Sequence, residues 1–350
     1  MTGIDDVAKL AGVSTATVSR ALSGRGHVAP RTREKVAAAA GQLGYVVNAD
    51  ASSLATGRTR NVGVVVPFLN RWFYTSVIEG AQRRLMQYGY DLTLYNLSGH
   101  DDERSSVFEH FLLRKRVDAV LAVSLELTEQ EVDSLHALGR PLVGVGGPIP
   151  GVPTFSIDDV AVTKLATEHL LSLGHRVIGH IGGDVERELS FHLPTNRRHG
   201  YELALREAGI EPDPALYYPA VFTMESGYQA AKQLLGEPRI RPTALVAASD
   251  EMAIGAMLAA RDMGLRVPGD LSVIGIDNHE LAPFFGLSTV DQHPGLQGER
   301  AVELLMEALQ PSGGADSVPA VDQPLPFDLI VRDSTARVPL QPAAVGSAHG

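Results

Sequence analysis

Apolar positions near the start of the chain recur at a helical spacing and are interrupted once by a glycine. The first run places four apolar residues at i, i+3, i+4 and i+7: Ile4, Val7, Ala8 and Ala11. This spacing predicts one buried face of an α-helix. Gly12 can adopt the left-handed conformation that ends such a helix, and Ser14 suits the N-cap of a second helix that buries Val18 and Leu22. We therefore predict two short helices joined by a tight turn.

The outward face of the second predicted helix carries small and polar side chains: Thr15, Ala16, Ser19 and Arg20. Short hydroxyls near a helix N-terminus suit phosphates, a methyl group allows close approach to a base edge, and arginine can donate two hydrogen bonds to guanine. This arrangement is typical of the recognition helix of a helix-turn-helix. A solvated pair of amphipathic helices is the alternative, because such hairpins are common.

A third helix is predicted from Pro30, since proline suits the first turn of a helix. Its apolar face comprises Val36, Ala40 and Leu43. Arg31 and Thr32 stand at its N-terminus, where basic and hydroxyl groups can hold phosphates. The alternative is a charged turn that meets only solvent.

From residue 61 onward the pattern changes to short apolar runs that alternate with amphipathic stretches. The apolar runs, typical of buried parallel strands, are 61–67, 91–95, 119–123, 142–145, 177–181, 244–247 and 273–276. The helical stretches between them include 75–88, 160–173, 197–208 and 251–263. Strand, helix, strand at this spacing predicts the α/β fold class, with two lobes built on doubly wound parallel sheets.

Three motifs in the first two helices carry a family resemblance: Asp6-Val7-Ala8, Ala11-Gly12-Val13-Ser14 and Ala16-Thr17-Val18-Ser19-Arg20. They resemble the start of the lactose-repressor (LacI/GalR) family of bacterial transcription regulators, and the resemblance extends to about Arg332. It implies a helix-turn-helix headpiece at 1–47, a hinge helix and linker at 48–60, and a two-lobed, periplasmic-binding-protein-like core at 61–334.

The resemblance also divides the core. It implies lobe one at about 61–160 and 291–322, and lobe two at about 161–290 and 323–334, with crossings near 158–161, 290 and 322. The last residues, 335–350, are rich in Pro, Ala, Gly and Ser without a period, and we expect them to be disordered.

In the headpiece the resemblance implies DNA contacts from eight residues: Ser14, Thr15, Ala16, Thr17, Ser19, Arg20, Arg31 and Thr32. In the short polar hinge at 48–55 it implies that Leu54 of each of two subunits enters the minor groove and wedges a base step apart. Ser52 stands where family members often carry a basic residue, so we expect weaker phosphate contacts there. The alternative for Leu54 is a linker side chain packed on the core.

The net charge of −11 argues against a nucleic-acid partner until it is divided along the chain. Residues 1–60 contain eight Lys and Arg against four Asp and Glu, a net +4, which leaves −15 for the remainder. A basic module fused to an acidic body suits a protein that meets DNA with one end only. The N-terminus lacks the basic start and apolar core of a secretory signal, so we expect a cytoplasmic protein.

Ligands of open α/β sheets bind beyond the carboxyl ends of the strands. Asn70, Trp72 and Phe73 follow the first apolar run, and we expect Trp72, the sole tryptophan, to stack on a sugar ring. The family more often shows a proline near Arg71, which favours a larger or differently shaped ligand here. The alternative is an aromatic plug at a helix start.

In the second lobe, matching family positions imply effector contacts from six residues: Arg197, Phe222, Ser249, Asp250, Asp277 and Gln292. Arginine donors and carboxylate acceptors are what polyhydroxyl recognition requires. Ser249 stands where asparagine is frequent, and Asp291 stands where a basic residue is usual. A purely structural role is the alternative at each position.

The chain offers no pattern for catalysis, a metal or a cofactor. The glycines at 144, 146 and 147 precede Pro148 rather than a helix, the histidines lack a metal-ligand spacing, and there is no cysteine. We therefore predict a homodimeric repressor, not an enzyme, that binds palindromic operator DNA and responds to a small carbohydrate, with no membrane partner. The rival interpretations are a sugar-binding transport protein, which the basic headpiece argues against, and a sugar-processing enzyme.

Overall fold

The computed structural model describes residues 3–23, 27–45, 57–97, 101–108, 116–125, 127–183, 192–237, 239–310 and 322–338. These residues form two compact units that divide near Asn61, and residues 116–118 belong with the first. The expected hinge at 48–55, with Leu54, lies outside the described residues. None of the helices in the described ranges has the length and apolar character needed to cross a membrane.

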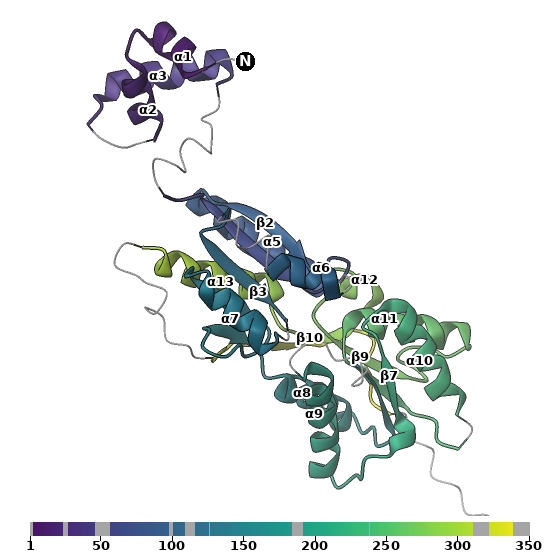
Figure 1. Ribbon diagram of the computed structural model, residues 1–350. Coiled ribbons are helices and arrows are strands. Elements are labelled where there is room, and N and C mark those ends of the chain that lie inside the picture. The colour runs from purple at the N-terminus through teal and green to yellow at the C-terminus, as the bar shows by residue number, and fades with distance from the viewer. Residues whose placement is uncertain are drawn as a thin grey trace, which may run out of the picture. The chain divides into compact units, whose positions relative to one another are not determined.

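The headpiece contains α1 (Ile4–Ala11), α2 (Thr15–Ser23) and α3 (Pro30–Leu43), as the sequence predicts (Figure 1). Gly12 ends α1 with φ 66°, the left-handed conformation that glycine adopts without steric cost. One small cluster of buried side chains holds the three helices together: Val7, Ala8, Ala11, Val18, Ala21, Val36, Ala39 and Ala40. Because every helix contributes to this cluster, the outward face of α2 has a fixed position within the headpiece.

Lobe one is built on a six-stranded sheet with the order β11-β5-β4-β3-β1-β2. Its strands are β1 (Asn61–Val66), β2 (Asp91–Asn96), β3 (Ala119–Val123), β4 (Leu142–Val145), β5 (Thr154–Ser156) and β11 (Asp322–Pro324). Its helices are α5 (Trp72–Tyr88), α6 (Asp101–Ser106), α7 (Glu129–Ala137) and α13 (Pro294–Ala308). The pairs β1–β3, β3–β4, β4–β5 and β5–β11 are parallel.

Helices α5 and α13 pack closely on each other and on this sheet. Their backbones approach so closely that a Cβ added at Gly80 would lie 2.0 Å from the carbonyl oxygen of Gly295. The start of α5 therefore has a firmly held position at the edge of lobe one.

Lobe two is built on a second six-stranded sheet with the order β12-β10-β9-β8-β6-β7. Its strands are β6 (Ile178–Gly183), β7 (Tyr217–Ala220), β8 (Ala244–Ala247), β9 (Ser272–Ile276), β10 (Ser288–Asp291) and β12 (Asp328–Ile330). Only β12 runs antiparallel to its neighbour among the pairings described for this sheet.

The helices of lobe two are α8 (Asp159–Ser172), α9 (Leu193–Glu207), α10 (Met224–Gly236), α11 (Asp250–Asp262) and the short α12 (Ala282–Phe285), with a 3-10 turn at Pro214–Leu216. Successive residues of β8 point to opposite faces. Leu245 and Ala247 join α10 and α11 in one core, and Ala244 and Val246 join α8 and α9 in another. The expected doubly wound α/β architecture is confirmed.

The chain passes between the two sheets three times, after Ser156, after Asp291 and after Pro324. The tail that was expected to be disordered from 335 is packed as far as Val338. The Thr335 hydroxyl lies 2.9 Å from His169 Nε2, and the Val338 amide donates to the Leu173 carbonyl at 3.1 Å. Residues 339–350 lie outside the described ranges.

Candidate functional site

The headpiece presents the predicted DNA-reading residues on its surface. Ala16, Ser19 and Arg20 are exposed on α2, and Thr15 and Thr17 are half-buried. Ser14 Oγ accepts a hydrogen bond from the Thr17 amide at 3.2 Å and lies 2.9 Å from Thr17 Oγ1, so this serine caps α2 as predicted.

At the start of α3, Arg31 is exposed and Thr32 is half-buried. Arginine and hydroxyl groups at the start of a helix are placed to meet phosphates.

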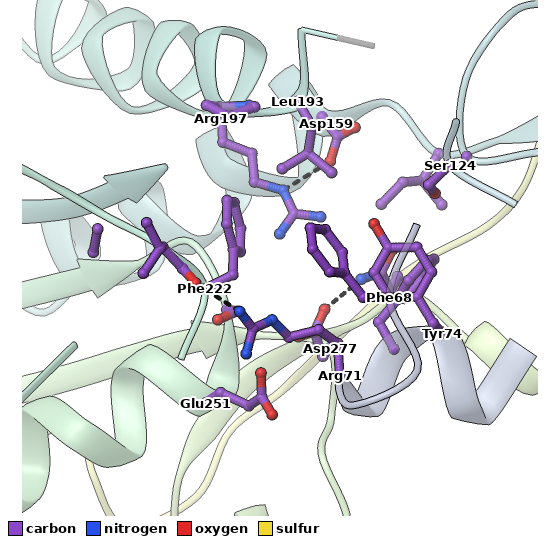
Figure 2. A pocket seen from close by; sticks show the side chains of 18 of the residues that line it. Phe68, Arg71, Tyr74, Ser124, Asp159, Leu193, Arg197, Phe222, Glu251 and Asp277 are labelled. Carbon is purple, nitrogen blue, oxygen red and sulfur yellow. Dashed lines mark hydrogen bonds and ion pairs between the residues drawn. The ribbon is translucent and has the colours of Figure 1, made fainter. Parts of the chain in front are cut away.

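The core holds a pocket of about 380 Å³ between its lobes (Figure 2). Lobe one contributes the aromatic residues Phe68, Phe73 and Tyr74, and lobe two contributes Phe222. The polar lining consists of Arg71, Ser124, Asp159, Arg197, Ser249, Glu251, Asp277, Gln292 and Gln297. Aromatic walls with a few convergent polar groups are typical of small-molecule sites.

Three residues that line this pocket lie one or two positions after a strand and have left-handed backbone conformations. Ser124 follows β3 with φ 44°, Phe222 follows β7 with φ 46°, and Asp277 follows β9 with φ 129°. Such conformations cost on the order of 1–3 kcal/mol each for residues other than glycine, and they persist where the surroundings impose them. The strain turns these three side chains into the space beyond the carboxyl ends of the strands.

Arg197 forms a buried ion pair with Asp159 on the wall of the pocket. Arg197 Nε donates to Asp159 Oδ1 at 2.8 Å, and its Nη1 donates to the Ala248 carbonyl. Arg197 is only 2% exposed. Burial raises the pKa of Asp159, and the Arg197 guanidinium opposes that rise. The pair joins the start of α8 to α9 and leaves the remaining guanidinium donors available beside the pocket.

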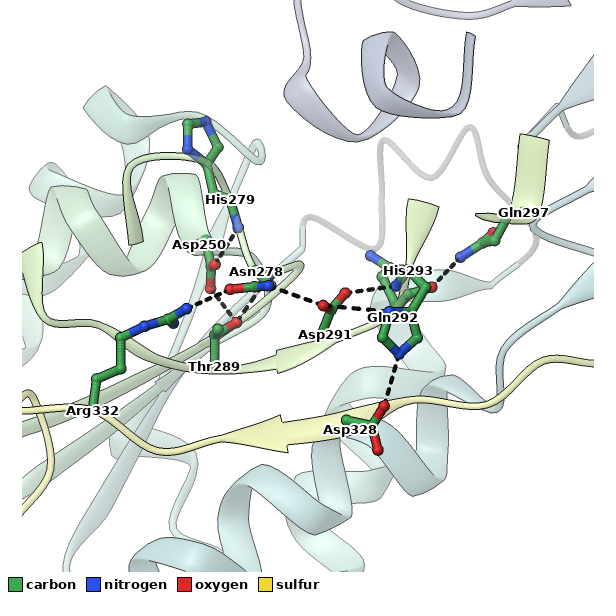
Figure 3. Close-up of polar contacts among 10 residues, drawn as sticks. All are labelled: Asp250, Asn278, His279, Thr289, Asp291, Gln292, His293, Gln297, Asp328 and Arg332. Atoms are coloured by element: carbon green, nitrogen blue, oxygen red, sulfur yellow. Dashed lines mark hydrogen bonds and ion pairs between the residues drawn. The ribbon is translucent and has the colours of Figure 1, made fainter. Parts of the chain in front are cut away.

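Asp277 is the most strongly perturbed carboxyl group that lines the pocket. The Gln292 side-chain amide donates to Asp277 Oδ1, and Gln297 Nε2 donates to the Gln292 carbonyl at 2.7 Å (Figures 2 and 3). Burial holds the pKa of Asp277 well above its usual range, and Arg197 opposes this shift. A carboxylate has about four acceptor positions, so Asp277 can also accept hydrogen bonds from a ligand.

Six of the nine residues expected to bind the effector line the pocket: Phe73, Arg197, Phe222, Ser249, Asp277 and Gln292. Asn70, Trp72 and Asp250 do not line it. Asn70 is exposed, and the Trp72 ring packs on the His279 ring with centroids 4.9 Å apart. The aromatic rings that do line the pocket are those of Phe68, Phe73, Tyr74 and Phe222.

Asp250 lies behind the pocket wall and organises the turn after β9 (Figure 3). It accepts a hydrogen bond from the Thr289 hydroxyl at 2.6 Å and one from the His279 amide at 2.8 Å. Burial raises the pKa of Asp250 to about 7, and the Thr289 hydrogen bond opposes this shift. Asp250 thus fixes the loop that carries Asp277, and it does not itself line the pocket.

The pocket also contains residues that the sequence-based set omits. Phe68, Arg71 and Tyr74 flank the expected aromatic segment, and Ser124 follows the apolar run of β3. Inspecting the residue after every apolar run would have found Ser124. Asp159 and Glu251 stand at helix starts, where acidic residues are common for reasons unrelated to ligands. The described residues contain no group of three His, Asp or Glu side chains that could hold a metal ion.

The headpiece and the core each match a known protein family. Residues 3–48 match the model described as bacterial regulatory proteins, lacI family, and residues 167–335 match the periplasmic binding protein-like domain. The HTH-type transcriptional repressor PurR of Haemophilus influenzae (strain PittEE) is 33% identical over 343 residues, which cover 97% of this chain and 100% of the relative.

Two solved structures are similar over nearly the whole chain. One is a complex of the transcriptional regulator CelR with cellobiose, which is 32% identical with a TM-score of 0.69 and covers 95% of this chain and 100% of its own. The other is the lac repressor dimer bound to operator and the anti-inducer ONPF, which is 29% identical with a TM-score of 0.79 and covers 96% of this chain and 99% of its own.

Proposed function

The chain belongs to the lacI family of bacterial regulatory proteins, and from this premise we propose that it is a homodimeric repressor controlled by a neutral carbohydrate. DNA binding and transcription regulation are properties of the family. The relatives are transcription regulators, and the chain is accordingly a regulator and not an enzyme. The observation that carries the finer proposal is the core pocket, to which both lobes contribute aromatic faces and charged groups.

The charges around the pocket favour a neutral ligand. Two arginines, Arg71 and Arg197, face three carboxyl groups, those of Asp159, Glu251 and Asp277. An anionic effector would find Arg197 already paired with Asp159 and would meet the acidic side chains of Glu251 and Asp277. A neutral molecule with several hydroxyl groups can instead donate to the carboxylates and accept from the arginines.

The aromatic lining favours a carbohydrate among neutral ligands. Phe73, Tyr74 and Phe222 offer ring faces to the apolar face of a pyranose, while Ser124 and Asp277 offer polar contacts at its edge. The cellobiose in the complex of the similar regulator CelR supports this class of ligand.

The DNA end is proposed to act in pairs. The similar lac repressor binds operator as a dimer, and two copies of α2 related by a two-fold axis would read the half-sites of a palindrome. Arg20 is proposed to read a guanine, and Arg31 to hold phosphate. Leu54 is proposed to open a base step at the centre of the operator.

The link between the two ends follows from the position of the pocket. A ligand shifts a two-state protein only by its different affinities for the two states, and a ligand that touches both lobes binds the closed cleft better than the open one. Closure would change the spacing of the two headpieces in a dimer and would alter operator affinity by about 1–3 kcal/mol.

Thermal-shift screening of neutral mono- and disaccharides against the full chain tests this proposal. A correct sugar at 100 times its dissociation constant should stabilise the core by ~2.7 kcal/mol. Phe222→Ala should abolish the shift, and Phe284→Ala should preserve it, because Phe284 is 85% exposed on α12 and is not among the pocket-lining residues. Stabilisation by free nucleobases or organic acids alone would contradict the carbohydrate assignment.

A further inference from the structure

The turn that begins α5 leaves lobe one and contacts lobe two at the rim of the pocket. Arg71 Nη2 donates to the Val221 carbonyl at 3.4 Å, and this contact joins the residue before α5 to the residue after β7. In Figure 2 Arg71 lies next to Glu251, which stands in the first turn of α11. Arg71 and Glu251 both line the pocket, so this contact forms part of its boundary.

Glu251 stands beside the first turn of α5 from the opposite lobe. The N-cap residue of α5, Arg71, makes no side-chain capping hydrogen bond. Burial raises the pKa of Glu251, and the Arg71 guanidinium and the Trp72 backbone oppose that rise, so both lie close to its carboxyl group. A carboxylate near the start of a helix is favoured by the helix dipole. The first turn of α5 therefore meets an acidic side chain of lobe two.

The rings of Trp72 and His279 form the third contact between the lobes. Their centroids are 4.9 Å apart with an interplanar angle of 35°. Two hydrogen bonds hold His279 in place: its amide donates to Asp250 at 2.8 Å, and its Nδ1 accepts from the Leu281 amide at 3.0 Å. Nδ1 is therefore unprotonated, and the His279 ring has a fixed tautomer and orientation.

We propose that Arg71, Trp72, Glu251 and His279 form an interlobe clasp that raises the fraction of closed molecules before the effector binds and leaves an open fraction for the effector to close. Within it, Trp72 and His279 are positioning residues, since neither lines the pocket. The apparent dissociation constant of a ligand equals its intrinsic value divided by the fraction of binding-competent molecules. A clasp that raises the closed fraction therefore strengthens effector binding, and Trp72 and His279 contribute to this without lining the pocket.

Only the predicted effect on sugar binding rests on the proposed function. The closed state itself can be measured with no effector present. Because the chain has no cysteine, Gln82→Cys on α5 and Gln229→Cys on α10 allow one spin label on each lobe at exposed positions. In dimers that carry one labelled subunit, prepared with an excess of unlabelled wild-type chain, double electron–electron resonance then reports the distance between the lobes in the full-length protein.

Without any sugar, the wild-type protein should show a population at the closed interlobe distance beside an open one. Trp72→Ala and His279→Ala should each enlarge the open population, and Trp72→Phe, which keeps a ring against His279, should restore most of the wild-type distribution. Phe284→Ala is the matched control, because it removes an exposed aromatic ring from lobe two. A sugar identified by the thermal-shift screen should bind Trp72→Ala roughly 2- to 12-fold more weakly, the range expected for loss of one aromatic pair.

Two results would overturn the clasp. One is a wild-type distribution without sugar that contains no population at the closed distance. The other is a Trp72→Ala distribution that equals that of the wild type or of Phe284→Ala. Neither result would affect the proposed function, which depends on sugar binding at Phe222 and on operator binding by the headpiece.

Discussion

Replacing Arg197 with methionine should destabilise the core by about 3–5 kcal/mol, because it leaves the Asp159 carboxylate buried without its partner. The side chains of the pair are only 3% and 14% exposed, so solvent does little to screen the lost interaction. The Ala248 carbonyl also loses its charged donor. For a core of this size the loss should lower the melting temperature by on the order of 10 °C.

The decisive comparison is with the double variant Arg197→Met/Asp159→Asn. It removes both charges and leaves mainly the unsatisfied Ala248 carbonyl, which costs ~1–3 kcal/mol. The double variant should therefore be more stable than the single variant, although it carries one more substitution. Urea unfolding followed by the emission of Trp72 measures this directly, since the sole tryptophan lies in the core and reports nothing of the headpiece.

The pH dependence provides a second signature. A buried Asp159 without Arg197 has a still higher pKa when folded than when unfolded, so the folded state binds the proton more tightly. Its favourable contribution is present below the unfolded pKa of about 4 and is lost as the pH rises. The loss of unfolding free energy caused by Arg197→Met should thus grow as the pH rises above about 4. A single variant as stable as the double variant, with a deficit independent of pH, would refute this reasoning.

Three other predictions follow from contacts elsewhere in the molecule. In the wild-type protein, the folded pKa of Asp250 is about 7, so its contribution to core stability is lost as the pH rises from about 4 to 7. Asp250→Asn should remove this fall in stability. Burial lowers the folded pKa of His180 to about 4, so in the wild-type protein its contribution to core stability is lost as the pH falls from about 6.5. His180→Phe should remove that loss, and so change the dependence of core stability on pH in the direction opposite to Asp250→Asn. Urea midpoints measured across this pH range test both variants. Gly80→Ala should separate α5 from α13 and cost ~1–3 kcal/mol or more of unfolding free energy, whereas Gly236→Ala, with open space around the added Cβ, should not. Arg31→Ala should weaken binding to all DNA sequences alike and reduce the salt dependence by about one phosphate contact, as measured by anisotropy titrations at several salt concentrations.

Long periodic segments could be predicted from the sequence because the spacing of their apolar residues shows which side chains are buried. The apolar run 119–123 forms β3, whose five residues are all buried, and the apolar spacing from Ile4 to Ala11 matches α1. Strands β5, β11 and β12 have only three residues each. A strand this short carries no period of its own, and its place is decided by the neighbouring strand.

The pocket was predicted less completely than the fold, for two physical reasons. Successive residues on a helix point about 100° apart, so the position of the aromatic segment could not show that Phe73 and Tyr74 line the pocket while Trp72 contacts His279. The left-handed conformations of Phe222 and Asp277 are imposed by packing, and neither residue is a glycine that would have indicated them. Asp250, expected in the site from its sequence position, lies behind the pocket wall, where its carboxylate accepts hydrogen bonds from the Thr289 hydroxyl and the His279 amide.

In vitro selection of operator DNA from a random library, with the wild-type chain and with Arg20→Ala, tests the central claim most directly. Arg20 is exposed on α2, the helix proposed to read base edges. The wild-type protein should select a palindrome, and Arg20→Ala should lose preference for one G·C pair in each half-site at a cost of ~1–3 kcal/mol. Selection of the same palindrome with undiminished preference at every base pair would contradict the assignment of α2 as the recognition helix.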